Sequence, residues 1–154
     1  MKIIKNILDY NTFKDLQNLI ISDQLAYYLG QPTETDNDCY FIHTIYEYDV
    51  PKSFLFEKIE PLLIKLKVKS LIRAKVNLFP KTEKLISYGT HIDLPYEHKG
   101  CVFSLNNCDG FTQIDNQNIP SIENQAFLFN SNKEHNSTST TNAPYRININ
   151  LNYF

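Results

Sequence analysis

The sequence predicts a mainly β domain of the sandwich or jelly-roll type, with helices at its N-terminal end. From residue 70 onward, short segments rich in β-branched and aromatic residues recur about every eight to twelve residues, with turn signals between them. Residues 1 to 69 instead place apolar side chains at helical spacing. The 154 residues, 42% of them hydrophobic, are expected to form a single domain, 1–154, in which 1–69 support a β core of residues 70–154.

The N-terminal part predicts two helical stretches with a strand between them. Asn11 is expected to cap the first helix. One face of this helix is apolar and contains Phe13, Leu16, Leu19 and Ile20. The second stretch, 53–66, contains Pro61, so it is either kinked there or begins anew. Residues 39–48 predict the strand, and the helices are expected to cover the outer face of one sheet.

About eight strands are expected in the rest of the chain. They are 70–79, 88–94, 100–106, 111–115, 118–122, 125–130, 134–138 and 145–154. The breaks between them are marked by Asp109-Gly110, Asn116-Gln117, Ser131-Asn132 and Asn142-Ala143-Pro144.

The last of these segments alternates strictly between polar and apolar residues. The polar set is Arg146, Asn148, Asn150 and Asn152, and the apolar set is Ile147, Ile149, Leu151 and Tyr153. Because alternate residues of a strand point to opposite faces, the apolar set should face the packed layer of the sandwich. The polar set should line a wet cavity.

Composition excludes several classes of function. A net charge of −2 argues against bulk nucleic-acid binding, and no apolar run approaches the length of a membrane span. The first residues lack the apolar core of a signal peptide. Three cysteines without a CxxC pair favour a reduced, cytoplasmic protein.

The strongest chemical pattern is formed by His91, Asp93 and His135. In a strand, His91 and Asp93 would project from the same face, and His135 follows 44 residues later in another predicted strand. Two imidazoles and one carboxylate are the set that holds non-haem Fe(II) with open coordination positions. The other histidines, His43 and His98, are better interpreted as structural or solvated.

The chain contains 13 Lys but only two Arg, so each arginine is a candidate functional residue. Arg146 opens the last predicted strand, where its guanidinium would suit a carboxylate. A surface arginine on an amphipathic edge strand is the plainer alternative. Arg73 is either a sheet-edge ion-pair partner or a pocket residue beside Asn77.

The stretch from about Leu71 to Phe154 resembles the prolyl 4-hydroxylase-like group of 2-oxoglutarate- and Fe(II)-dependent oxygenases. Their HxD…H…R/K pattern is matched by His91, Asp93, His135 and Arg146. The secondary matches are Tyr88-Gly89-Thr90-His91 to YxxHxD, Ser104-Leu105-Asn106 to YLN, Gly110-Phe111-Thr112-Gln113-Ile114 to a G-x-T/L-x-I/F strand, and Tyr153-Phe154 to the closing aromatic pair. The resemblance implies a double-stranded β-helix of about eight strands.

The resemblance also implies a reaction and roles for residues. His91, Asp93 and His135 would be iron ligands, and Arg146 would bind the distal carboxylate of 2-oxoglutarate. Oxygen and 2-oxoglutarate would yield succinate and CO2 while a peptide side chain (prolyl-type) or small molecule is hydroxylated. Ser104, Tyr88 and Asn77 are expected in the cosubstrate pocket, although Ser104 stands where many relatives have tyrosine.

Two other interpretations remain open from the sequence. One is a metal-binding sandwich without oxygenase activity. The other is a β-sandwich without enzymatic activity, such as a viral structural or binding module. Metal content and affinity for 2-oxoglutarate would separate the three hypotheses.

Overall fold

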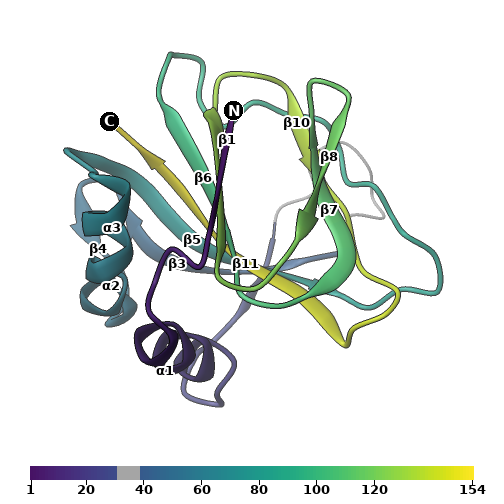
Figure 1. Ribbon diagram of the computed structural model, residues 1–154, viewed down its shortest axis with the longest axis horizontal. Helices are drawn as coiled ribbons and strands as arrows, with labels where there is room; N and C mark the ends of the chain where they lie inside the picture. The colour runs from purple at the N-terminus through teal and green to yellow at the C-terminus, as the bar shows by residue number, and fades with distance from the viewer. Residues whose placement is uncertain (31–38) are drawn as a thin grey trace.

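The computed structural model describes residues 1–30 and 39–154, and these contain eleven strands and three helices (Figure 1). The strands are β1 (Lys2–Lys5), β2 (Tyr28–Leu29), β3 (Phe41–Glu47), β4 (Val50–Pro51), β5 (Leu71–Pro80), β6 (Lys99–Ser104), β7 (Cys108–Ile114), β8 (Gln117–Ser121), β9 (Gln125–Asn130), β10 (His135–Ser137) and β11 (Tyr145–Tyr153). The helices are α1 (Tyr10–Ile20), α2 (Leu55–Lys58) and α3 (Glu60–Leu66).

The strands form two sheets, as the predicted sandwich requires. The larger sheet has eight strands in the order β1-β9-β6-β11-β5-β3-β2, with β4 paired to β3, and the smaller sheet has the order β10-β7-β8. Every strand pair in both sheets is antiparallel. The smaller sheet lies over one face of the larger sheet, and the helices lie on the other side (Figure 1). The predicted mainly β jelly roll with N-terminal helices is confirmed, with more strands than the eight expected.

The main apolar core lies between the helices and the larger sheet. It joins buried residues of α1 and α3, such as Phe13 and Leu62, to buried residues of the sheet, such as Phe103 and Ile147. A smaller cluster lies toward the smaller sheet and consists of Val102, Ile114, Phe127 and Phe129. The helices therefore cover the outer face of one sheet, as predicted, and the chain places most of its apolar burial there.

The two faces of β11 are both buried but differ in polarity. Ile147, Ile149 and Leu151 are fully buried in the main core, and Asn148 and Asn150 face the other way, into a cavity. The predicted alternation is confirmed. However, the apolar set packs against the helices and not against the smaller sheet. The polar set is therefore the one that faces the space between the two sheets.

The predicted strand 88–94 is wrong. The segment makes one isolated bridge, between His91 and His135, and Ser87 just before it makes another with Thr138. His91 and His135 exchange both backbone hydrogen bonds at 3.0 Å, and the amide of Asp93 donates to the carbonyl of Ser131. The pairing is spread over separate short contacts, so no continuous ladder forms.

Two other local predictions need correction. Asp109-Gly110 does not break the chain but lies within β7, at a register shift opposite β8. Helix α1 is capped by Asp9, whose carboxylate accepts a hydrogen bond from the amide of Thr12, so Asn11 lies inside the helix. At Pro61 a new helix begins, because Pro61 lies in the first turn of α3.

The short strands β1, β2 and β4 were not predicted. β1 pairs with β9 along Lys2–Lys5, so it forms one edge of the larger sheet. β2 and β4 both pair with β3 and have two residues each. Segments this short give no periodicity in the sequence.

Candidate metal centre

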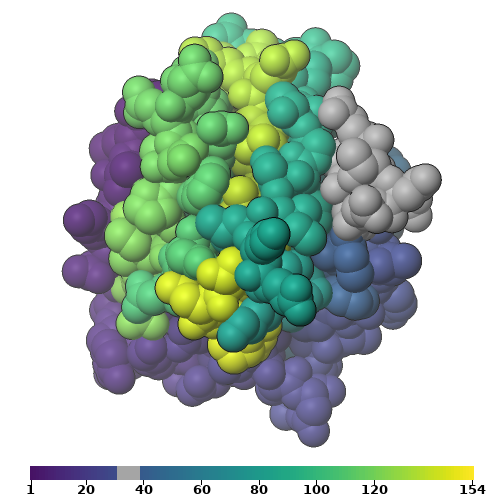
Figure 2. All heavy atoms as spheres, turned by 90° about the vertical axis from the view of Figure 1, so that its right-hand side faces the viewer, coloured from purple at the N-terminus to yellow at the C-terminus, as the bar shows by residue number. Residues whose placement is uncertain are grey.

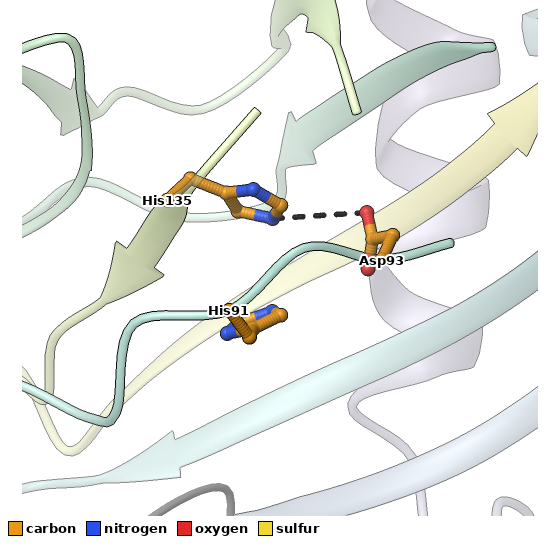
Figure 3. Close-up of side chains that lie close together, drawn as sticks. All are labelled: His91, Asp93 and His135. Carbon is orange, nitrogen blue, oxygen red and sulfur yellow. Dashed lines mark ion pairs between the residues drawn. The ribbon is translucent and has the colours of Figure 1, made fainter. Parts of the chain in front are cut away.

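His91, Asp93 and His135 lie together between the two sheets (Figure 3). His91 and Asp93 come from the segment between β5 and β6, and His135 is the first residue of β10. One ligand atom from each residue lies within 4.8 Å of the other two. The His91–His135 backbone bridge brings the imidazole centroids to 4.6 Å. The structure therefore brings the three predicted residues to one point.

Each imidazole of this group is oriented by a backbone carbonyl. Nδ1 of His91 lies 3.0 Å from the oxygen of Gly89, and Nδ1 of His135 lies 2.8 Å from the oxygen of Lys133. A carbonyl can only accept a hydrogen bond, so Nδ1 of each ring carries a proton. Nε2 is therefore the nitrogen of each ring that is left to bind a metal.

The group has an unsatisfied atom at its centre. Nε2 of His135 is buried and has no hydrogen-bond partner. It lies 3.7 Å from Oδ2 of Asp93, which is too long for a hydrogen bond. Burial lowers the pKa of His135 despite the nearby Asp93 carboxylate, so the ring is neutral at pH 7. A buried lone pair facing a carboxylate at this distance fits a cation between the two residues.

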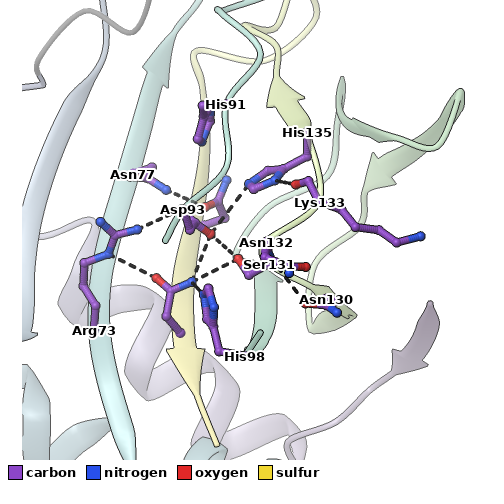
Figure 4. A network of polar contacts seen from close by, with 12 residues as sticks. Arg73, Asn77, His91, Asp93, His98, Asn130, Ser131, Asn132, Lys133 and His135 are labelled. Carbon is purple, nitrogen blue, oxygen red and sulfur yellow. Dashed lines mark hydrogen bonds and ion pairs between the residues drawn. The ribbon is translucent and has the colours of Figure 1, made fainter. Parts of the chain in front are cut away.

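Asp93 is held by a network of side chains (Figure 4). Its Oδ1 accepts a hydrogen bond of 2.8 Å from Arg73, and its Oδ2 accepts bonds from Asn152, at 2.9 Å, and from Ser131. Burial favours the neutral acid, but the His135 ring, which is charged only in acid, together with Arg73 and these hydrogen bonds, outweighs it and lowers the pKa of Asp93 to about 2. A carboxylate has about four lone-pair positions. Asp93 therefore presents an ionised, fixed oxygen that could bind a metal.

The three residues open into a cavity of about 270 Å³. Its lining combines aromatic, cationic and amide side chains from several elements. Besides the three candidate ligands, it consists of Tyr40, Arg73, Lys75, Asn77, Phe79, Tyr88, Ile92, Val102, Ser137, Asn148 and Asn150. Figure 2 shows the face of the molecule on which the teal chain that follows β5 lies beside the green and yellow chain of the C-terminal half.

Arg146 is a buried cation without a carboxylate partner. It is 1% exposed, and its terminal nitrogens donate to the carbonyl of Thr138, at 3.1 Å, and to Oγ1 of Thr112, at 2.8 Å. Its Nε has no partner, and no carboxylate of the described residues lies within 4.0 Å. Burial lowers the pKa of Arg146 to about 10. A buried charge of this kind is costly until an anion pairs with it.

The surroundings of Arg146 are shaped for its side chain. Its guanidinium lies 5.3 Å from the ring centroid of Phe79, which lines the cavity. A Cβ at Gly110 would come within 2.7 Å of Cδ of Arg146, so only glycine leaves room there. Arg146 itself does not belong to the cavity lining, and neither does the buried Ser104, which pairs with Asn148 across β6 and β11.

The other two predicted pocket residues do line the cavity. Asn77 donates a hydrogen bond of 3.2 Å to Asn148, and its Oδ1 is buried without a partner. Tyr88 is buried and lies 5.1 Å from the ring of Phe79. Roles in binding a cosubstrate remain predictions for Arg146, Ser104, Tyr88 and Asn77.

Sequence reasoning missed part of the Asp93 network. His98 is buried and not solvated, and its Nε2 lies 3.1 Å from the Asn152 amide that contacts Asp93. Arg73 lies in the interior of the larger sheet, where its partner Asp93 is one of the candidate ligands. The polar face of the last strand, which includes Asn152, was the available signal. His43 is structural, as predicted, because its ring contacts Ala26 and Ser53.

No helix in the described parts of the chain has the length and apolar character needed to cross a membrane. No protein-family model and no curated protein sequence matches this chain. Solved structures do match it over nearly its whole length. Because their sequence identities are low, the similarity is one of fold.

The first of these structures is a prolyl hydroxylase from Trichoplax adhaerens in complex with a hypoxia-inducible-factor peptide fragment. It is 19% identical, with a TM-score of 0.72, over 99% of this chain and 82% of that chain. A prolyl 4-hydroxylase from Pseudomonas putida is 12% identical, with a TM-score of 0.68, over 99% and 91% of the two chains.

The epimerase SnoN from nogalamycin biosynthesis, in complex with Fe3+ and α-ketoglutarate, is 10% identical. Its TM-score is 0.68, over 99% of this chain and 77% of that chain. These likenesses agree with the two-sheet architecture of this chain. The chain therefore has the jelly-roll fold of the prolyl hydroxylase-like 2-oxoglutarate- and Fe(II)-dependent oxygenases.

Proposed function

We propose that this chain is an Fe(II)- and 2-oxoglutarate-dependent oxygenase that hydroxylates a peptide side chain or a small molecule. The observation that carries the proposal is the convergence of His91, Asp93 and His135 within 4.8 Å, with the buried Nε2 of His135 unpartnered. Two imidazoles and one carboxylate leave coordination positions open, as non-haem Fe(II) oxygenases require.

The residues of the site have separate roles in this proposal. His91, Asp93 and His135 would hold the iron, and Arg73, Asn152 and Ser131 would keep the Asp93 carboxylate ionised and fixed. Bound Fe(II) would enable oxidation of the substrate by O2, while 2-oxoglutarate is converted to succinate and CO2. The carbonyls of Gly89 and Lys133 would maintain the imidazole tautomers that bind metal.

Arg146 supports 2-oxoglutarate as the cosubstrate. Its buried guanidinium has no carboxylate partner among the described residues, and it stacks on Phe79 at the wall of the cavity. A dicarboxylate would supply the missing counter-charge. A metal site serving another purpose would not need a buried arginine at this position.

The class of primary substrate is open between peptides and small molecules. Two of the similar structures are prolyl hydroxylases and one is an epimerase, so the fold is compatible with more than one reaction. O2 and 2-oxoglutarate are the cosubstrates that the proposed reaction requires.

The decisive experiment is an anaerobic titration of Fe(II) into the apoprotein in excess 2-oxoglutarate, followed by visible absorbance. We expect a weak metal-to-ligand charge-transfer band that is absent from His91→Ala. His43→Gln is the matched control, because it removes an imidazole that contacts Ala26 and Ser53 outside the site. Iron binding without the band would favour the metal-binding sandwich, and absence of iron binding would contradict both hypotheses.

A further inference from the structure

Lys75 is the feature of the cavity that the proposed function does not use. It lies on β5 between Arg73 and Asn77, and all three side chains line the cavity. Arg73 is paired with Asp93, and Asn77 with Asn148. Among the described residues, no hydrogen bond or ion pair involves the Lys75 ammonium, and no carboxylate lies within 4.0 Å of it.

The environment of Lys75 is unfavourable for an unpaired cation. Burial and the neighbouring Arg73 lower the pKa of Lys75 to about 8. Glu47 and Asp93 partly oppose this effect, but Glu47 does not line the cavity and Asp93 is already bound to Arg73. The ammonium therefore occupies a polar cavity without the counter-charge that a half-buried lysine normally has.

A second polar group beside Lys75 is also unsatisfied. Asn150 is opposite Lys75 in the β5–β11 register and lines the same cavity. It is 7% exposed, and its Oδ1 has no partner. Because either end of an amide can be presented after a half-turn of the group, Asn150 can donate to an acceptor held by Lys75. A cation without an ion pair and an amide with an unpartnered buried oxygen thus lie side by side on one part of the wall.

The cavity has an excess of positive charge that the proposed iron and 2-oxoglutarate do not remove. Arg73, Lys75 and Arg146 are three cations in or against the cavity wall, and Asp93 is its single carboxylate, which leaves two positive charges. Fe(II) brings two positive charges and 2-oxoglutarate two negative charges, so they cancel each other. One further anionic group would therefore be stabilised in the loaded cavity.

We propose that Lys75, with Asn150 beside it, binds a carboxylate of the primary substrate next to the His–Asp–His group. This inference rests on the proposed function and narrows its substrates to acidic molecules or acidic side chains. The cavity of about 270 Å³ is near the lower end of small-molecule sites, about 300–1,000 Å³. A small carboxylic acid, or the acidic end of a larger molecule, fits this space.

The test uses acetate as the probe and the full-length chain loaded with Zn(II) and saturating 2-oxoglutarate. Amide chemical shifts of β5 are followed by NMR during an acetate titration, with chloride at equal ionic strength as the reference. We expect the apparent Kd for acetate to rise at least tenfold in Lys75→Met, since a charge-assisted hydrogen bond is lost. Lys75→Arg should retain binding, and Lys84→Met, which changes an exposed lysine, should match the wild type.

The carboxylate bound by Lys75 could belong to the primary substrate or to 2-oxoglutarate. Calorimetric titration of 2-oxoglutarate into the same Zn(II)-loaded variants separates these two possibilities. The proposal requires Lys75→Met to retain its affinity for 2-oxoglutarate. A tenfold loss would assign Lys75 to the cosubstrate and overturn the proposal, as would equal acetate binding by Lys75→Met and the wild type. If the wild type binds no 2-oxoglutarate, the proposed function fails, but the acetate titration of the Zn(II)-loaded protein still decides the role of Lys75.

Discussion

The two faces of the larger sheet are both buried, but they are built from different side chains. On the face toward α1–α3, Ile147, Ile149 and Leu151 are 0% exposed and pack in the main apolar core. On the opposite face, Asn148, Asn150 and Asn152 are 0–7% exposed and belong to a polar cavity and its network. The outer face supplies stability through apolar burial, and the inner face gives up that stabilisation to hold charged and amide groups.

This difference agrees with the proposal that the inner face is the functional one. Buried polar groups are normally satisfied, yet Asn77, Asn150 and His135 each retain an unpartnered buried atom on this side. Each of these residues lines the same cavity. A metal ion would satisfy the lone pair of His135, and hydrogen-bond donors of a bound ligand would satisfy the two amide oxygens.

The largest expected effect is on metal binding after His91→Ala. Loss of one of three ligands should weaken Fe(II) or Zn(II) binding by more than the roughly 10–100-fold that follows loss of a supporting residue. The unfolding free energy of the apoprotein should change little, because His91 is only half-buried and packs in no apolar cluster. Metal titration and denaturant unfolding measure the two quantities. Equal metal affinity in the variant would remove His91 from the ligand set.

Adjacent residues of β11 give the sharpest test of the two faces. Ile149→Ala should cost about 2–5 kcal/mol of unfolding free energy, since it leaves a cavity in the main core. Asn150→Ala should cost less than about 1 kcal/mol, because its Oδ1 has no partner to lose. Urea denaturation of the two apoproteins gives both values. Equal costs would show that the inner face is as important for stability as the outer face.

Arg146→Leu should separate ligand binding from stability. Removal of a charge-assisted pair should weaken 2-oxoglutarate binding by about 1.5–3 kcal/mol, or roughly 10–150-fold. The apoprotein should lose less stability than Ile149→Ala, because the buried guanidinium has no counter-charge there. Calorimetry with the metal-loaded protein measures the affinity. Unchanged affinity would move the anchor of the distal carboxylate to another residue.

The smallest expected effect is a change in acid stability after Asp93→Asn. The pKa of Asp93 is about 2 in the folded chain and about 3.9 in an unfolded one. At pH values above the unfolded pKa, the ionised Asp93 therefore contributes about 2 kcal/mol to the free energy of unfolding. This contribution is lost as the pH falls through the folded pKa. The unfolding free energy of the apoprotein should depend less steeply on pH in Asp93→Asn between pH 5 and pH 2, a window set by these pKa values.

Asp115→Asn is the matched control for this measurement. Asp115 forms an exposed ion pair with Lys133 at 2.9 Å, and pairs of this kind contribute roughly 0–1 kcal/mol. It should leave the pH dependence nearly unchanged. An equal flattening in both variants would contradict the special contribution of Asp93.

Much of the candidate site could be predicted because it follows from local patterns. His91 and Asp93 are two residues apart, and the alternation of β11 assigns Asn148 and Asn150 to one face without knowledge of any partner strand. The prediction that residues 88–94 form a strand was nevertheless wrong. That segment bonds in turn to Ser137, His135 and Ser131, and a sequence does not reveal whether such contacts join into a ladder.

The sequence by itself determined the mainly β class with N-terminal helices, the polar and apolar faces of β11, and the residues able to bind a metal. Only the tertiary structure decided which partners those residues meet. Arg73 reaches Asp93 across 20 residues and Asn152 across 79, and the buried His98 contacts Asn152 across 54. Side-chain alternation is a local property of the backbone, whereas these contacts exist only after distant strands pair and their polar groups are buried together.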